Sequence, residues 1–357
     1  MYLYLSIRFG KIVSRGFFLL AFLILFVSAV SASVVIENDE KLTNITNADH
    51  PSWSPDGKMI VYAANQAIWV MNSDGSGQKK LYDGMAWEGD PVFNDDGTEI
   101  YFAAESKKAY SARYISIHMM NADGSNGLKL TESADSREPS VNPDGSRLAY
   151  ASRASGNYDI WTMASNGTDN IRLTDGDGDE TSSSWNPEGN TIVYSSSGDI
   201  FIIDIDAVRP IGLIQDTYNN VEPAYSPDGE TIAYASDVGG DYDLWLMNPT
   251  GSSQVKLTSD LSSEKAPSWS PDGNKIAYVS NEGGDYNIWL MTFGDEEIEF
   301  ELTEKTVDIE ENQINNTQLI KLREYAIKEP REFIGIVLLF SFVFVVFIVG
   351  SFMRKIS

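Results

Sequence analysis

The sequence predicts an all-β fold, a six-bladed β-propeller of four-stranded blades, plus one C-terminal transmembrane helix. Three observations predict it. A turn motif recurs six times, each repeat contains four short β-rich runs, and a long uncharged apolar segment follows the last repeat. The length of 357 residues allows one large domain or two average ones, so the repeats decide the architecture.

The repeated turn contains an acidic residue followed by Gly, and in five of the six copies Pro precedes the acidic residue. Pro fixes φ and Gly accepts a positive φ, so the motif forms a tight turn. Successive Gly residues are 40, 48, 44, 40 and 44 residues apart, which is the period of a propeller blade. The six turns occupy residues 53–57, 93–97, 141–145, 185–189, 225–229 and 269–273.

Four strands are expected in each repeat. The first ends at the turn, the second follows it (275–280 is an example), the third contains Ile-Trp or Leu-Trp, and the fourth ends in Lys-Leu or Arg-Leu. One such unit cannot bury its own faces, so the units pack radially, with large aromatic side chains between them. The predicted propeller spans 33–303, with blades at about 51–82, 90–131, 139–174, 183–214, 223–258 and 267–303.

Ring closure leaves two alternatives for the fourth strand of blade six. Residues 41–43 read Lys-Leu-Thr and precede the first blade, whereas residues 300–303 read Phe-Glu-Leu-Thr and follow the last one. Both segments resemble the fourth strands of the other blades, and the sequence does not decide between them.

The N-terminus predicts a secretory signal peptide over residues 1–32. Arg8, Lys11 and Arg15 precede an apolar run over 16–30, and small residues allow cleavage after Ala32. The alternative is an uncleaved membrane anchor, since the apolar run extends to Ile36.

The C-terminal region predicts a membrane anchor. Residues 304–332 form an acidic stalk, and the 21 residues 333–353 are uncharged and long enough to span a bilayer. Arg354 and Lys355 follow at once, so the tail 354–357 is expected in the cytoplasm and the propeller outside the cell membrane.

Charge and cysteine content restrict the partners. The formal net charge is −26; residues 1–33 and 333–357 hold five basic residues and no acidic ones, so residues 34–332 carry −31. Such a domain repels nucleic acid and attracts cations or a basic protein or peptide, although the acidity also has a simple role in solubility. The chain has no Cys, which excludes disulfides and thiolate catalysis.

One register of the repeat predicts a binding site. His50, Asp90, Glu138 and Glu222 each precede a Pro where the innermost strand begins, and Ser182 and Ala266 occupy this register in the other two blades. In a propeller this point lies at the mouth of the central channel, so one His and three carboxylates would share an opening. We expect a site for a cation or a basic ligand; the alternative is a solvated loop whose acids cap turns.

Two other motifs have weaker functional interpretations. The alternating residues Asp175, Asp177 and Asp179 could coordinate one Ca²⁺ through their carboxylate oxygens. The alternative is an exposed acidic loop between blades. Three sequons predict glycosylation, at Asn44, Asn166 and Asn315.

Aromatic positions carry their own expectations. His118 occupies the third-strand position that Trp holds in other blades, so it is expected to be a packing residue. Loops 156–159, 239–243 and 283–287 combine Gly with Tyr, which suits either an adaptable binding rim or hairpin turns with Tyr packed on the next blade.

The motif Pro-Ser-Trp-Ser-Pro-Asp-Gly at 51–57 and 267–273, with Ile-Ala-Tyr in second strands and Ile-Trp-x-Met in third strands, resembles the TolB-like propeller repeat. This repeat is also called PD40 or WD40-like. The resemblance covers about residues 41–303 and implies the propeller fold, in a family of partner-binding propellers and propeller domains attached to serine peptidases. Blade four departs from the pattern, because residues 200–203 lack Trp, and blade two has an insertion over 105–114.

The expected function is binding rather than catalysis. No Gly-x-Ser-x-Gly motif occurs, so the hydrolase of the peptidase relatives is missing and we predict no enzyme activity. The predicted protein is a membrane-anchored extracytoplasmic propeller that binds a protein or peptide at its channel mouth. The alternatives are a metal-dependent lyase or hydrolase acting on an external polymer, and a structural component of the cell envelope.

Overall fold

The computed structural model describes residues 28–105, 114–132, 134–206, 209–294 and 299–304. The chain divides into two compact units, Val30–Thr303 and the combined ends Met1–Ala29 and Glu304–Ser357. None of the described residues forms a helix able to span a bilayer. The predicted stalk, transmembrane helix and tail lie outside the described residues, as do residues 1–27 of the predicted signal peptide.

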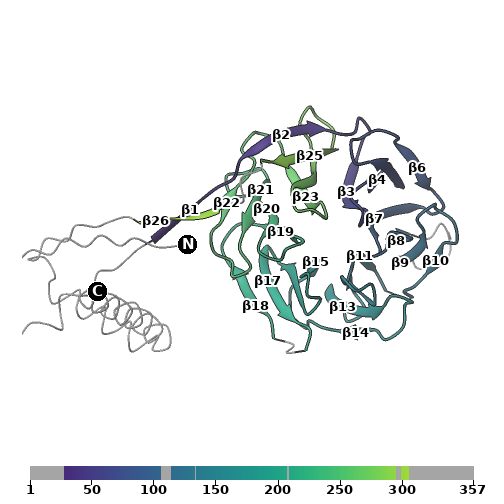
Figure 1. Ribbon diagram of the computed structural model, residues 1–357. Helices are drawn as coiled ribbons and strands as arrows, with labels where there is room; N and C mark the ends of the chain where they lie inside the picture. Colours follow the sequence, from purple (N-terminus) through teal and green to yellow (C-terminus); the bar gives the residue numbers. More distant parts are fainter. Residues whose placement is uncertain (1–27, 106–113, 133, 207–208, 295–298, 305–357) are drawn as a thin grey trace, which may run out of the picture. The chain divides into compact units, whose positions relative to one another are not determined.

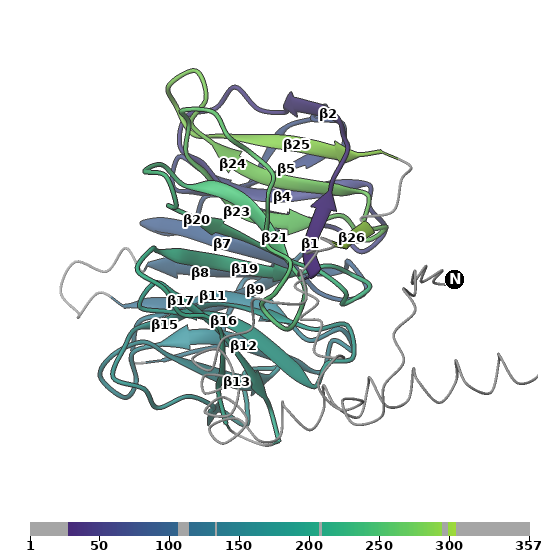
Figure 2. The ribbon, with the colours of Figure 1, turned by 90° about the vertical axis from the view of Figure 1, so that its left-hand side faces the viewer.

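The unit Val30–Thr303 confirms the predicted propeller: six four-stranded antiparallel sheets surround a common centre (Figure 1). The turned view shows strands of neighbouring sheets stacked on one another (Figure 2). From blade one to blade six, the innermost strands are β3 (Ala48–Trp53), β7 (Trp87–Phe93), β11 (Ser136–Val141), β15 (Glu180–Trp185), β19 (Asn220–Tyr225) and β23 (Glu264–Trp269).

The other three strands of each blade follow outward, in chain order in blades one to five. The second strands are β4 (Met59–Ala64), β8 (Glu99–Glu105), β12 (Arg147–Ser152), β16 (Thr191–Ser196), β20 (Ile232–Ser236) and β24 (Lys275–Ser280). The third strands are β5 (Ala67–Asn72), β9 (Ile115–Asn121), β13 (Asp159–Ala164), β17 (Asp199–Asp204), β21 (Asp243–Met247) and β25 (Asn287–Phe293). The outer strands are β6 (Lys79–Tyr82), β10 (Leu128–Lys129), β14 (Ile171–Arg172), β18 (Ile211–Ile214), β22 (Val255–Lys256) and, for blade six, β2 (Ile36–Lys41).

Ring closure is resolved by β2, which pairs antiparallel with β25 and completes blade six from the N-terminal side. The Tyr278 hydroxyl donates to Asp39 at 2.8 Å and fixes β2 against the sheet. The other candidate segment lies in β26 (Glu299–Glu304), which pairs with β1 (Ser28–Ser33) in a separate two-stranded sheet. Residues 299–303, included in the predicted range of blade six, are therefore not part of that blade.

Each innermost strand begins three residues before the predicted start of its blade, at residue 48 in place of 51 in blade one. The prediction placed the start within the channel-mouth register or one residue after it, at a Pro in four of the six blades. In the structure a bulge accommodates this Pro inside the strand, so pairing continues on its N-terminal side.

The core consists of six clusters of buried side chains, one at each junction between neighbouring blades. Trp53, at the end of β3, is 8% exposed, and its indole N–H donates to the carbonyl oxygen of Ser268 in blade six at 3.1 Å. Tyr62 and Tyr234 in the second strands are almost fully buried. The predicted role of the aromatic residues as packing between blades is confirmed.

The closure of the ring can be tested at Thr43, which is fully buried after β2. Its hydroxyl donates to Asn287 Oδ1 at 3.1 Å and accepts the backbone N–H of Ile288 at 2.9 Å. Thr43→Val removes both bonds and leaves buried polar groups unpaired, so we expect urea unfolding to show a loss of about 1–3 kcal/mol. The control Thr46→Val removes an exposed bond to Asn65 and should cost under about 0.5 kcal/mol. Equal effects of the two changes would contradict the closure argument.

Candidate functional site

A bulge in every innermost strand builds the channel mouth. In blade one, His50 and Pro51 together stand opposite Tyr62, because Asp49 pairs with Ala63 and Ser52 with Val61. The first residue of each bulge adopts the left-handed conformation, with φ between 44° and 54°, and in five of the six blades a Pro follows it. The following Pro disfavours the right-handed helical region at this position, and the bulge accommodates the extra residue. The six residues are His50, Asp90, Glu138, Ser182, Glu222 and Ala266.

All six bulge residues line one cavity of about 320 Å³, together with the residue that follows each of them, which is Ser183 in blade four and Pro in the other five. The structure thus brings together the four predicted residues, His50, Asp90, Glu138 and Glu222, from four different blades. Ser182 and Ala266 complete the circle with short side chains. We refer to this cavity as the channel mouth.

Carboxylates of the channel mouth bind the next blade around the ring. Asp90 accepts the backbone N–H of Glu138 at 3.1 Å, and Glu138 accepts that of Ser182 at 2.6 Å. Glu222 accepts the backbone N–H of Ala266 at 2.6 Å. The acids therefore cap the bulges of neighbouring blades, which is the structural role that the sequence left open. They also line the cavity, so capping and ligand binding do not exclude each other.

His50 is the basic group of the channel mouth. Its Nδ1 lies 3.1 Å from Asp49 Oδ1 and 3.5 Å from Asp90 Oδ1, and 31% of its side chain is exposed. Burial disfavours the charged imidazole, but the carboxylates of Asp49 and Asp90 outweigh this effect and raise the pKa of His50 well above its ordinary value. Burial and the Asp90 carboxylate also raise the pKa of Glu138. His50 and Glu138 therefore retain their protons to a higher pH than isolated side chains do.

A second cavity of about 420 Å³ adjoins the channel mouth between blades one and two, and we call it the side cavity. His50 and Asp90 line both cavities. The side cavity adds the indole of Trp87 and the carboxylate of Asp49; its polar lining also includes the amides of Asn47, Asn65 and Gln66. The sequence analysis missed this feature.

A departure from the repeat could have revealed the side cavity. Three residues before each bulge residue the other blades have Asn, Asp or Ser, whereas blade two has Trp87. Any side chain at Gly89 would overlap the Trp87 indole, and blade two is the blade with Gly directly before its bulge residue. The two substitutions together make room for an aromatic side chain in the side cavity.

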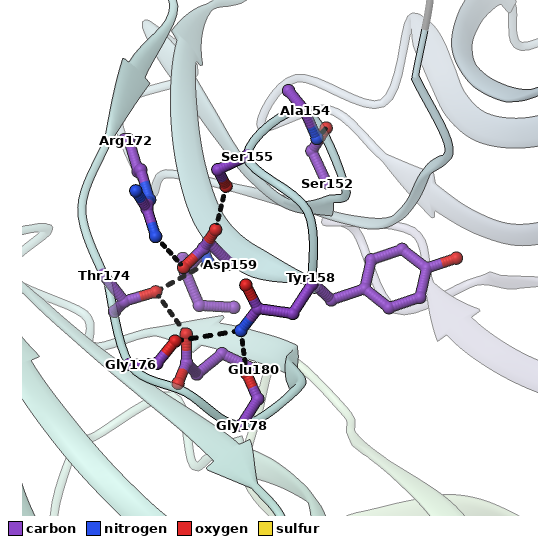
Figure 3. Close-up of polar contacts among 12 residues, drawn as sticks. Ser152, Ala154, Ser155, Tyr158, Asp159, Arg172, Thr174, Gly176, Gly178 and Glu180 are labelled. Atoms are coloured by element: carbon purple, nitrogen blue, oxygen red, sulfur yellow. Dashed lines mark hydrogen bonds and ion pairs between the residues drawn. The ribbon is translucent and has the colours of Figure 1, made fainter.

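Buried carboxyl groups connect blade three to blade four (Figure 3). Asp159 accepts a hydrogen bond from Arg172 Nη2 at 2.8 Å and another from Ser155. Thr174 donates to Glu180 at 3.0 Å and accepts the backbone N–H of Ile160. Burial raises the pKa of Glu180. Since Glu180 begins β15, this network positions the innermost strand that leads to the channel mouth.

The Tyr-containing loops pack within the ring. Tyr158 is 6% exposed and its ring lies 4.8 Å from the Arg137 guanidinium and 4.3 Å from that of Arg153. The carbonyl oxygen of Tyr158 accepts the backbone N–H of Glu180 in the next blade at 2.7 Å. These contacts favour the hairpin interpretation for the loop of Tyr158, whereas Tyr286 in the loop 283–287 is 36% exposed. His118 is 7% exposed and stacks on Phe102 at 5.5 Å, so its predicted packing role is confirmed.

The acidic loop of Asp175, Asp177 and Asp179 is exposed. Asp179 Oδ1 already accepts the backbone N–H of Tyr158 at 2.9 Å, and its Oδ2 lies 3.5 Å from Arg153. Across the described residues, no group of three or more His, Asp or Glu is arranged to hold a metal ion. The loop therefore lies on the surface between blades with one carboxylate used as a cap.

Two of the three sequon residues, Asn44 and Asn166, are exposed. Asn166 Oδ1 accepts the backbone N–H of Thr168 at 3.1 Å and its hydroxyl at 2.7 Å, so this sequon forms a compact polar turn. Asn315 lies outside the described residues. Glycosylation of these residues stays a prediction.

The raised pKa of His50 predicts a pH-dependent stability. A group with a raised folded pKa contributes its full stabilisation below the unfolded value, near pH 6.5, and loses it as the pH rises through the folded pKa. We expect the stability difference between the wild type and His50→Gln, measured by urea unfolding, to shrink between about pH 6 and pH 9.

His118 provides the control for this titration. Burial lowers the pKa of His118 to about 4, so His118→Gln should change the stability difference as the pH falls below about 6.5 and not above it. A pH-independent effect of His50→Gln would overturn the electrostatic account of the channel mouth.

Comparisons with known proteins agree with the fold. A family model described as the TolB beta propeller domain matches residues 195–319. The Tol-Pal system protein TolB of Anaeromyxobacter dehalogenans (strain 2CP-C) is 29% identical over 162 residues. That match covers 42% of this chain and 36% of the relative, so the chain corresponds to about a third of the relative's length.

Two solved structures share the propeller fold. A TolB structure from Agrobacterium tumefaciens is 22% identical with a TM-score of 0.59, covering 74% of this chain and 99% of that chain. An oligogalacturonate lyase in complex with manganese is 18% identical with a TM-score of 0.51, covering 71% of this chain and 79% of that chain. The sequence repeats and the six closed blades agree with these matches: this chain is a six-bladed β-propeller that is similar to the TolB beta propeller domain.

Proposed function

We propose that this TolB-like propeller binds a basic protein or peptide segment at its channel mouth, on the outer face of a membrane. The observation that carries the proposal is the convergence of His50, Asp90, Glu138 and Glu222, from four blades, on one cavity. Each of these positions is held by a bulge in a closed ring, so the groups are arranged before a ligand arrives. Preorganised groups reduce the cost of ordering on binding.

Charge complementarity favours a basic ligand. Three of the four convergent groups are carboxyls, in a segment of formal charge −31. Such a surface attracts a positively charged partner and accelerates its encounter, especially at low salt. A cavity of about 320 Å³ suits an extended segment or a few side chains, rather than a folded domain.

The side cavity supplies a place for a Lys or Arg side chain. Trp87 offers an aromatic surface for an ammonium or guanidinium group, and Asp49 and Asp90 provide negative charge beside it. His50 and Asp90 belong to both cavities, so a peptide in the channel mouth could place one side chain in the side cavity. This arrangement favours a peptide with a basic residue over a simple cation.

The comparisons give this proposal a biological context. One relative is named as a protein of the Tol-Pal system. The predicted signal peptide and the apolar segment 333–353 support a propeller tethered outside the cell membrane. The acidic segment 304–332 would separate the propeller from the bilayer.

Binding can be tested with labelled decapeptides in which Lys alternates with Ala, and with matched peptides that carry Gln or Glu in place of Lys. Fluorescence polarisation should show binding of the Lys peptide, weakened by added salt because exposed charges are screened. Glu222→Gln should weaken binding by about tenfold, equivalent to about 1.4 kcal/mol, while Gln can still accept the Ala266 N–H. Glu138→Gln should act in the same direction.

The matched control is Glu188→Gln, which removes a carboxylate of the same type from the turn 185–189, outside the residues that line the channel mouth. It should leave the affinity unchanged apart from a small general charge effect. Equal losses for Glu188→Gln and Glu222→Gln would show that binding is diffuse attraction to an acidic surface. Absence of binding by any of the three peptides would favour the structural envelope role.

Membrane attachment is tested separately. The full chain should sediment with membranes and resist extraction at high salt, whereas a variant ending at residue 332 should be released into the soluble fraction. The physical reason is the transfer of about 20 apolar residues into the bilayer. External protease should digest the propeller in intact cells from which the outer envelope layers have been removed. Protection of the propeller would reverse the proposed orientation.

A metal-dependent lyase is the second candidate function. Its support is the fold shared with an oligogalacturonate lyase that binds manganese. The channel mouth has one His among its convergent groups, and the described residues contain no arranged set of metal ligands. Formation of unsaturated products from oligogalacturonate with Mn²⁺, abolished by a chelator, would favour this candidate over peptide binding.

A further inference from the structure

One histidine lies where the two cavities of the candidate site meet. His50 and Asp90 are the residues that line both the channel mouth and the side cavity. They lie on β3 and β7, the innermost strands of blades one and two. A ligand that occupies both cavities therefore contacts these two side chains, and the charge that it meets there depends on whether His50 is protonated.

The imidazole of His50 already pairs with the carboxylates that would attract a basic ligand. Its Nδ1 lies 3.1 Å from Asp49 Oδ1 and 3.5 Å from Asp90 Oδ1. The Asp90 side chain is only 10% exposed, so salt screens its charge less than that of a surface carboxylate. Glu88 also lines the side cavity, but its Oε1 accepts the backbone N–H groups of the loop before β7. Asp49 and Asp90 are therefore the carboxylates that a cation beside His50 would meet.

Charged groups from three further blades act on His50 or on its partners. Glu222 on β19 and Glu138 on β11 add negative charge. Lys265 on β23 adds positive charge and acts on Asp49. Negative charge exceeds positive charge around the ring, which favours its protonated form. Protonated His50 is thus a cation that the protein itself supplies to the site.

We propose that a basic ligand displaces the proton of His50 when it binds, because the proton and the ligand compete for Asp49 and Asp90. This inference rests on the proposed function and specifies how pH regulates the same site. A Lys or Arg side chain in the side cavity would place a second positive charge beside the imidazolium, and like charges at short range repel each other. The proton leaves to solvent, His50 becomes neutral, and the two carboxylates pair with the ligand instead.

The charge of the side cavity shows why this proton matters. Apart from Glu88, the charged side chains among its described lining residues are Asp49, Asp90 and His50. Two carboxylates and one imidazolium give a net charge of −1, whereas two carboxylates and a neutral ring give −2. Loss of the proton therefore doubles the negative charge that a ligand cation meets beside the indole of Trp87.

Linkage between proton and ligand gives the direction of the effect. If the ligand binds the protein with neutral His50, the apparent dissociation constant is the intrinsic one divided by the neutral fraction. Burial disfavours the charged ring, but the Asp49 and Asp90 carboxylates outweigh it and raise the pKa of His50 well above its ordinary value. The neutral fraction is therefore small near pH 6 and grows as the pH rises. Affinity for a basic ligand should increase in the same direction, by up to about tenfold per pH unit.

The test uses the full chain in detergent and the labelled decapeptide of alternating Lys and Ala, whose Lys side chains stay charged to about pH 9. Polarisation is measured from about pH 6 to pH 9 at constant ionic strength, and the dissociation constant of the wild type should fall at least about tenfold. His50→Gln has no titrating group at this position. Its affinity near pH 6 should exceed that of the wild type and should change by less than about threefold over the range.

His118→Gln is the matched control, because it removes the other His of the chain, which lines neither cavity. It should keep the pH dependence of the wild type. Glu138 also has a raised pKa, from burial and the Asp90 carboxylate, and it remains in His50→Gln. That variant therefore measures what Glu138 contributes to the pH dependence without His50.

Calorimetry tests the same step without a substitution. The peptide is titrated into the wild-type chain near pH 7.5, in phosphate and in Tris, whose enthalpies of protonation differ. The difference between the two binding enthalpies measures the protons released, and we expect release of up to about one proton per peptide. His50→Gln should release almost none.

Three results would contradict the inference and leave the proposed function standing: a wild-type affinity that stays constant with pH, a pH dependence that persists unchanged in His50→Gln, or binding without proton release. Loss of the pH dependence in His118→Gln as well would also count against the inference, since the effect would then not belong to the channel mouth. A peptide that binds at no pH, even near pH 9, would overturn both the inference and the proposed function.

Discussion

Each blade of this propeller can bury its two faces only against its neighbours, and the rest of the structure depends on this constraint. The six apolar clusters lie at the six junctions, so no blade has a core of its own. A ring of such units is stable when it is closed, since an open end would expose the face of a whole sheet. β2 provides that closure by joining a strand from before blade one to blade six.

Closure also gives the channel mouth its geometry. Because the blades are fixed around one centre, six bulges at equivalent positions face one another across a cavity. The left-handed conformation at these bulges is unfavourable for residues other than Gly and persists where surrounding structure stabilises it. A carboxylate from the preceding blade supplies that support in three blades, and in two of these a Pro follows the bulge residue as well. The same carboxylates then create the negative potential that would attract a basic ligand.

The repeats allowed the blades to be predicted because turn chemistry is local. Pro and Gly determine the turn whatever the rest of the chain does, so strand order followed from spacing alone. The choice between residues 41–43 and 300–303 depended on contacts between the two ends of the propeller, and both segments have the local pattern of an outer strand. The strand starts were misplaced by three residues because Pro marks a strand end in most contexts and is accommodated here by a bulge.

The candidate site was predictable where it followed the repeat and not where it departed from it. His50, Asp90, Glu138 and Glu222 share one register, so the fold brings them together by symmetry. Trp87 occupies a position at which the other blades have short polar residues. Its indole fits there because Gly89 has no side chain. In this repeat protein the recurring residues predict the fold, whereas contacts made by one blade alone depend on residues that depart from the repeat.

In blade four, two paired residues on neighbouring strands both depart from the repeat. Phe201 replaces the Trp of the third strand, and Gly212 replaces the basic residue that pairs with it in other blades. Lys80 in blade one lies 5.8 Å from the ring of Trp69, which is a cation–π contact that blade four cannot make. Phe201 keeps an aromatic ring, so it is the missing cation at Gly212 that removes this contact, and the outer strand β18 is left without a charge.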